Sequence, residues 1–288
     1  MEWHLIREPG DPELDRLAER FHLHPLHVED CRHRGQTAKV EENHTYLFVV
    51  LKPVAVNAGG SLDIDDLDLF VGADFLITVQ ESGNPQVARL LDQIHAACGD
   101  LRPDQVLYRV ADGVVDSYLP IIEHFNDAID TLEDEVLEKP APEALSRIFE
   151  TKRALIELRR VLANMRDVSA HLQRTESNLI GRDLWPFLRD LYDHLARNLD
   201  MVEMQRDLLT GALDIYLSSV ANRTNQVMKA LTVLSTIALP ILLISSVYGM
   251  NIHGLPWIDS PYGAVITAGM MAAITVVLLL ILRRFRWF

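Results

Sequence analysis

Two long segments near the C-terminal end of the chain are apolar throughout. Residues 230–250 include 21 positions without a charged side chain, and residues 264–282 include 19 more. As helices, both would be about 30 Å long, which is the hydrocarbon thickness of a bilayer. Little chain is left here to cover two buried core helices. The pattern therefore predicts transmembrane helices at 227–250 and 264–282, joined by an extracytoplasmic loop at 251–263.

The first hundred residues alternate between strand and helix patterns. Residues 46–51 form a short apolar run typical of a buried strand, and residues 67–71 and 75–79 flank Gly72-Ala73-Asp74, a hairpin signal. Short helices are expected where a proline stands in a first turn. These expected helices cover residues 12–21, 25–31 and 85–98. We therefore expect a cytosolic α/β domain over residues 1–102.

Helical patterns replace the strand signals from about Pro103. Two charge-rich helices are predicted at 116–138 and 142–174. A third is predicted to begin near Pro186 and to continue to Tyr248, about 90 Å at 1.5 Å per residue. Its apolar positions recur at steps of three and four, at Leu188, Leu191, Leu195, Leu199 and Val202. Residues 103–226 are thus expected to form a helical stalk, which makes the chain an α+β membrane protein.

The charges are distributed unevenly along the chain and predict its orientation. The net charge is −14, yet only two of the 41 acidic residues follow position 213. The loop at 251–263 contains no Lys or Arg, whereas the tail at 283–288 contains three Arg. By the positive-inside rule both termini are cytoplasmic, in a multi-pass protein of the plasma (inner) membrane. The acidic soluble part disfavours nucleic-acid binding, which needs a cationic surface.

Polar residues recur on one face of the first predicted span. They follow one another at helical steps of three and four, interleaved with apolar positions, and include Asp214, Asn225, Thr232, Ser235 and Ser246. Ser and Thr also mediate helix packing in membranes, which is one explanation. The other is a pore built from several copies around an axis, where rings of carboxylates and amides favour cations.

The end of this span carries a recognisable motif. Tyr248-Gly249-Met250-Asn251 closes the first of two C-terminal spans, and a short loop and a basic tail follow. Residues 214–220, 222–229, 186–194 and 24–30 extend the similarity upstream. Together these segments resemble the CorA family of magnesium transporters, and the resemblance covers most of the chain.

The resemblance implies a funnel-shaped homopentamer that passes Mg²⁺, and possible further cargoes are Co²⁺ and Ni²⁺. The filter would be Gly249, Met250 and Asn251, with the Asn251 amide oxygens holding an ion that keeps its waters, because Mg²⁺ dehydrates reluctantly. Asn225 would be an inner site and Asp214 the cytoplasmic mouth. The residues expected to line the pore are Asp214, Asn225, Met228, Leu231, Thr232, Ser235, Leu239 and Leu242.

The resemblance also implies control by cytosolic Mg²⁺, bound between neighbouring subunits. Asp190 matches the stalk carboxylate of such a sensor. Its partner is expected from the N-terminal domain, where the sequence does not separate four candidates: Asp63, Asp65, Asp66 and Asp68. Mg²⁺ would be both the cargo and the regulator, and no organic cofactor is expected.

The outer loop departs from the family pattern. Trp257 stands where the family often has a glutamate, and His253 adds an imidazole, a ligand type that suits Zn²⁺, Co²⁺ or Ni²⁺. A Zn²⁺ transporter of the same superfamily, proton-coupled or not, is therefore one alternative. A membrane-anchored helical scaffold that conducts nothing is another. An enzyme is not expected, because the chain has no HExxH, P-loop or nucleophile-elbow motif.

Overall fold

The computed structural model describes residues 1–33, 35–57, 60–81, 84–138, 140–175, 177–250, 255–257 and 260–284. By packing, these residues separate into two compact units, Met1–Ile215 and Tyr216–Phe288, and each is described by itself. We call them the N-terminal unit and the C-terminal unit. The boundary predicted at residue 102 falls inside the N-terminal unit, where all strands and three short helices precede it and the longer helices follow it.

A five-stranded sheet forms the centre of the N-terminal unit, in the order β1-β7-β6-β3-β2. β1 runs parallel to β7, and the other neighbours are antiparallel. A separate two-stranded sheet pairs β4 with β5. The strands are β1 (Glu2–Ile6), β2 (Lys39–Glu42), β3 (Tyr46–Leu51), β4 (Val54–Val56), β5 (Leu62–Ile64), β6 (Leu67–Gly72) and β7 (Phe75–Gln80).

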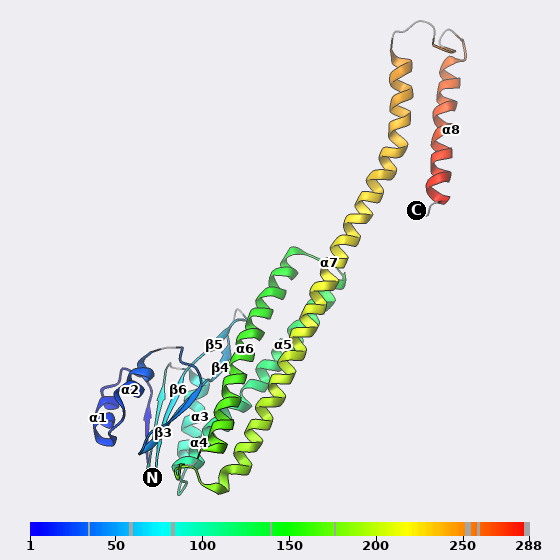
Figure 1. Cartoon of the computed structure of the whole chain (residues 1–288). Helices are drawn as coiled ribbons and strands as arrows, with labels where there is room; N and C mark the ends of the chain where they lie inside the picture. Colours follow the sequence, from blue (N-terminus) through cyan, green and yellow to red (C-terminus); the bar gives the residue numbers. More distant parts are fainter. Residues whose placement is uncertain are drawn as a thin grey trace. The chain divides into compact units, whose positions relative to one another are not determined.

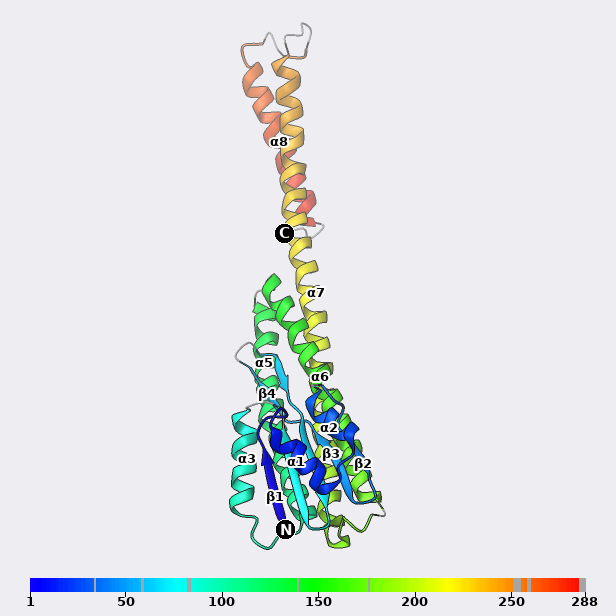
Figure 2. The ribbon, with the colours of Figure 1, turned by 90° about the vertical axis from the view of Figure 1, so that its left-hand side faces the viewer.

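Helices cover both faces of the five-stranded sheet (Figure 1 and Figure 2). The helices α1 (Pro12–Phe21) and α2 (Pro25–Arg32) pack their apolar side chains on one face, where the core is built around Phe48 and Phe70. The helices α4 (Pro103–Asp116) and α6 (Pro142–Arg174) lie on the other face, and α3 (Pro85–Ala96) packs against α4. Burial on both faces explains why β3 is apolar at every position instead of alternating.

The long helices follow the predicted course with one correction. α6 and α5 (Tyr118–Glu138) lie within about two residues of their predicted bounds. However, residue 116 does not begin a helix. It ends α4, a separate helix for which the sequence prediction made no provision, and Ser117 separates it from α5. After a 3-10 turn, η1 (Arg182–Leu184), α7 runs as one helix over Trp185–Gly249, close to the predicted 186–248.

The C-terminal unit consists of the last part of α7 and of α8 (Gly263–Arg284), shown in orange and red in Figure 1. Both helices are long and apolar enough to cross a bilayer, and none of their most apolar 18-residue windows is buried. The α8 bounds match the predicted second span. The two helices thus expose apolar surface that a chain in water would hide.

Candidate ion pathway and metal-binding cluster

The predicted pore-lining positions form an uncovered face of α7. Met228, Leu231, Leu239 and Leu242 are between 55 and 64% exposed, and Asp214, Asn225 and Ser235 are exposed as well. Only Thr232 is half-buried, and its hydroxyl donates to the Met228 carbonyl oxygen at 2.7 Å, one turn earlier in the same helix. By contrast, a neighbouring stripe of the same helix is half-buried; it comprises Val233, Ile237, Ile244 and Tyr248. The face on which the polar residues lie is therefore open to other copies of the chain.

The C-terminal end of this helix is described up to the first two predicted filter residues, Gly249 and Met250. α7 ends at Gly249, and the Met250 amide donates to the Val247 carbonyl oxygen at 3.3 Å. The third predicted filter residue, Asn251, lies outside the described residues, as do His253 and Asp259 of the loop. The Tyr248 hydroxyl donates to the carbonyl oxygen of Pro256, which lies in the described part of the loop, at 3.3 Å. This hydrogen bond joins the loop to the last turn of α7.

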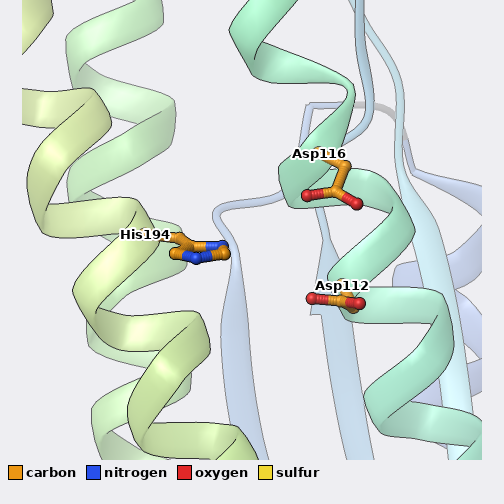
Figure 3. A group of neighbouring side chains, drawn as sticks. All are labelled: Asp112, Asp116 and His194. Atoms are coloured by element: carbon orange, nitrogen blue, oxygen red, sulfur yellow. The ribbon is translucent and has the colours of Figure 1, made fainter.

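A cluster of potential metal ligands lies where α4 faces α7 in the N-terminal unit. Asp112 and Asp116 are one turn apart on α4, and His194 projects toward them from α7 (Figure 3). Their ligand atoms all lie within 4.8 Å of one another. Asp190 lies one turn before His194, with its Oδ2 atom 3.8 Å from His194 Nε2. We refer to Asp112, Asp116, Asp190 and His194 as the α4–α7 cluster.

Negative charge accumulates in this cluster, and the pKa values of neighbouring groups record it. Partial burial raises the pKa of Asp112, and the charges of Asp116 and Asp190 add to this effect. Burial, together with the charges of Asp112 and Asp190, raises the pKa of the Tyr108 phenol to about 12. Both shifts show that further negative charge is disfavoured here, so a bound cation would relieve the repulsion.

The donor set fits a divalent cation. Mg²⁺ prefers oxygen ligands in octahedral geometry and usually keeps several waters, so two or three carboxylates suffice for a hydrated ion. The His194 imidazole is a direct ligand for Co²⁺, Ni²⁺ or Zn²⁺ and a hydrogen-bond partner for a water on Mg²⁺. Asp116 and Asp190 are exposed, whereas Asp112 and His194 are half-buried. The cluster is therefore open on one side to water or to a further ligand.

The four N-terminal aspartates predicted as sensor partners differ in their surroundings. Asp66 and Asp68 are 3 and 1% exposed. Asp66 pairs with the buried Lys52 and accepts hydrogen bonds from the Gly35 and Gln36 amides at 3.0 and 2.9 Å. Among the four, only the exposed Asp63 and the half-buried Asp65 reach the surface, where they line a cavity of about 670 Å³.

The sequence prediction named Asp190 as a sensor carboxylate but not Asp112, Asp116 and His194, which the structure places near it. Asp112 and Asp116 lie on α4, the helix that was overlooked. Its signal was present in the apolar positions Val106, Leu107, Val110, Ala111, Val114 and Val115 after Pro103. That spacing is helical and would have placed both aspartates on one polar face. No sequence signal pairs this face with His194, which follows nearly 80 residues later.

Comparison with known proteins identifies related transporters. Residues 1–284 match the model of a family described as CorA-like Mg²⁺ transporter protein. The cobalt/magnesium transport protein CorA of Thermotoga maritima is 35% identical over 278 residues, which cover 95% of this chain and 79% of that protein. The divalent cation transporter CmaX of Pseudomonas aeruginosa is 26% identical over 244 residues, covering 84% of this chain and 73% of CmaX.

Solved structures agree on the fold. The CorA magnesium transporter of Methanocaldococcus jannaschii superposes with a TM-score of 0.87 at 24% identity, covering 99% of this chain and 91% of that one. Fold, two apolar C-terminal helices and sequence similarity therefore point the same way. The chain belongs to the CorA-like family of Mg²⁺ transporter proteins and is a membrane transporter of divalent metal ions.

Proposed function

We propose that five copies of this chain form a channel for hydrated Mg²⁺ in the plasma (inner) membrane, with both termini in the cytoplasm. The observation that carries this proposal is the uncovered face of α7, on which Asp214, Asn225 and Ser235 lie between large apolar side chains. Polar groups at membrane depth are tolerated where they line a water-filled passage, and a ring of identical helices provides one.

The residues of this face suit a hydrated cation. A ring of Asp214 carboxylates would attract divalent cations at the cytoplasmic mouth, and rings of Asn225 and Asn251 amides would hold the ion through its water shell. Met228, Leu231 and Leu239 would form apolar rings between these polar sites. Such constrictions close by losing their water, so small rotations of α7 would open or shut the passage.

We further propose that the α4–α7 cluster is the cytosolic Mg²⁺ sensor. Its carboxylates lie close together, and the charges of Asp116 and Asp190 add to the burial that raises the pKa of Asp112. A divalent cation would stabilise the arrangement in which they converge. An exposed carboxylate of the neighbouring subunit's N-terminal unit would complete the site, and Asp63 and Asp65 are the sequence-predicted candidates that lie at the surface. Bound Mg²⁺ would then favour the closed symmetric state and reduce flux.

Ion uptake into liposomes that contain the purified protein tests the channel. Asn251→Ala and Asn225→Ala should each reduce Mg²⁺ uptake at least about tenfold, because each removes a ring of five amides. Thr224→Ala is the matched control, since Thr224 is equally exposed but points about 100° away from Asn225 on the same helix. Uptake by the unmodified protein no greater than that of protein-free liposomes would favour the non-conducting scaffold, whereas measurable uptake that is unchanged in both asparagine variants would contradict the proposed pathway. Competition among Mg²⁺, Co²⁺, Ni²⁺ and Zn²⁺ separates a magnesium channel from a zinc transporter.

The same liposomes test the sensor. Raising Mg²⁺ on the cytosolic side should inhibit uptake by the unmodified protein, and Asp190→Asn together with His194→Ala should weaken this inhibition. Asp63→Asn and Asp65→Asn show whether either residue contributes from a neighbouring subunit. If inhibition persists at the same Mg²⁺ concentration after the α4–α7 cluster is changed, the sensor lies elsewhere.

A further inference from the structure

An arginine clamp joins the two elements that carry the α4–α7 cluster. Arg102 immediately precedes α4, and its guanidinium lies between Asp104 of α4 and Asp183 of η1. Arg102 Nε donates to Asp104 Oδ1 at 3.0 Å, and Arg102 Nη2 donates to Asp183 Oδ1 and Oδ2 at 2.8 and 2.9 Å. Charge-assisted hydrogen bonds of this forked kind are stronger and more directional than ordinary surface ion pairs.

The surroundings of the clamp fix its geometry. The Asp104 carboxylate is almost fully buried, and its Oδ2 accepts the Gly181 amide at 2.8 Å as well as Arg102 Nη2 at 3.1 Å. A Cβ atom at Gly181 would lie 2.3 Å from Asp183 Oδ1 and 2.5 Å from Arg102 Nη2. A side chain at this position would crowd the ends of the paired side chains, and glycine leaves them room. The ion pairs and the Gly181 amide bond join the segment that leads into α7 to the start of α4.

The clamp and the cluster lie on the same pair of helices. Between them the rings of Tyr108 on α4 and Phe187 on α7 are in contact, with their centroids 5.4 Å apart. Asp112 follows Tyr108 by one turn, and His194 follows Phe187 by two turns. A helix is stiff over one or two turns. A spacing that is fixed at the starts of α4 and α7 therefore also sets the separation of Asp112 and His194.

The clamp opposes the electrostatic repulsion within the α4–α7 cluster. Without a cation, Asp112 and Asp116 on α4 repel Asp190 on α7, and this repulsion favours separation of the two helices. The forked contact of Arg102 with Asp104 and Asp183 opposes that separation. A site held together before the ion arrives binds it more tightly, because less ordering is needed on binding.

We infer that Arg102 and Asp183 are positioning residues for the metal-binding cluster, which hold α4 and η1–α7 at the spacing where Asp112, Asp116 and His194 converge on one ion. The inference rests on the proposed function and deepens it. Neither residue contacts the ion. Their contribution is to the Mg²⁺ concentration at which the sensor responds, and the rate of ion passage through the pore is left unchanged.

The test uses the full-length protein and two measurements. One is the cytosolic Mg²⁺ concentration that halves uptake into liposomes, and the other is the Mg²⁺ concentration that gives half of the Mg²⁺-induced rise in melting temperature. Arg102→Met and Asp183→Asn should each raise both concentrations about fivefold, the lower end of usual coupling between sites. The double variant should respond like Arg102→Met alone, because that change already breaks the contact with Asp183. Asp183→Glu, which keeps the charge, should restore most of the response.

Arg147→Met is the matched control. Arg147 forms a forked pair with Glu135, at 2.8 and 2.7 Å, on α6 and α5, with an exposure similar to that of Arg102. It should leave both Mg²⁺ concentrations unchanged. Clamp variants that only lower the Mg²⁺-free melting temperature, with the two concentrations unchanged, would show a merely structural role and overturn the inference. A response that moves with Asp190→Asn but not with the clamp variants overturns the inference alone, whereas an unmodified protein without any Mg²⁺ response overturns the proposed sensor and the inference together.

Discussion

The two units of this chain use their apolar residues in opposite ways. In the N-terminal unit most apolar side chains of β3, β6 and α5 are buried within the same chain, with Phe48, Phe70 and Tyr118 fully covered. In the C-terminal unit none of the described residues of α8 is buried. The first unit therefore contains the information for its own core, whereas the second needs a bilayer and further copies of the chain.

The largest expected effect lies in the self-contained core. Phe48 lies in the centre of β3, and its ring contacts those of His27 and Phe70 with centroids 4.5 and 4.9 Å away. Phe48→Ala should lower the free energy of unfolding of the N-terminal unit by about 3–5 kcal/mol, through lost burial and the cavity left behind. Phe149→Ala, at a 46% exposed position on α6, should change it by less than about 0.5 kcal/mol. Thermal unfolding followed by circular dichroism measures both, and equal effects would mean that the core does not stabilise this unit.

The next largest effect is expected from a lysine at an exposed apolar position, and it should differ between the two units. Val276 on α8 and Leu137 on α5 are 54 and 63% exposed. Val276→Lys should cost about 3 kcal/mol of membrane insertion, as a cation near the centre of a span does. Leu137→Lys should cost less than about 0.5 kcal/mol of folding free energy, because the side chain stays in water. The fraction of protein that remains in membranes after alkaline extraction measures insertion. Equal retention of both variants would contradict a membrane role for α8.

A pH-dependent effect of middle size is expected at Asp68. Burial raises its pKa to about 7, and its Oδ1 atom has no hydrogen-bond partner among the described residues. The native state then keeps a proton that the unfolded chain releases near the ordinary pKa of 3.8, so stability should fall as the pH rises from about 4 to about 7 and stay low above that.

Asp68→Asn should remove this loss. The variant should match the original protein near pH 4 and exceed it by roughly 2 kcal/mol at pH 8, given about 1.4 kcal/mol per pH unit and some relaxation around the site. Asp63→Asn, at an exposed position on β5, is the control and should show no such window. The measurement is the midpoint of urea unfolding at several pH values, and parallel curves for all three proteins would contradict the raised pKa.

The smallest effect should come from a surface contact between helices of the N-terminal unit. Arg159 on α6 pairs with Glu203 on α7 at 2.8 Å, and both side chains are nearly half exposed. Arg159→Met should cost about 0.5 kcal/mol, because water and salt screen exposed ion pairs. High salt should lower the stability of the original protein to that of the variant. A loss of several kcal/mol would instead show that this pair governs how α7 is held.

The sequence allowed prediction of most helices and of the strands that are buried on both faces. β3 is marked by an uninterrupted apolar run, β6 and β7 by mostly apolar runs, and the hairpin between β6 and β7 by Gly72 and Asp74. β1 and β2 were missed because they lie at the sheet edges, where polar residues such as His4 and Glu41 interrupt the apolar pattern. α4 was not predicted as a separate helix, although its apolar positions recur with helical spacing between the strands and the longer helices.

The Asp68 environment illustrates what sequence reasoning could not reach. The sequence alone does not distinguish four aspartates that lie within six residues of one another: Asp63, Asp65, Asp66 and Asp68. Strand pairing explains why Asp68 is buried and Asp63 is exposed, because β6 is covered on both faces whereas β5 is paired only with β4. A carboxylate one or two positions further along the chain is therefore either a surface ligand or a buried acid.

By itself the sequence determined the apolar spans, the polar face of α7 and the motif at its end, because a helix turns local spacing directly into a face. Only the tertiary structure decided that Asp112 and Asp116 meet His194, and that Arg102 holds Asp183 beside them. These contacts join residues about 80 positions apart. Their geometry depends on how α4 and α7 pack across the unit, which no local pattern encodes.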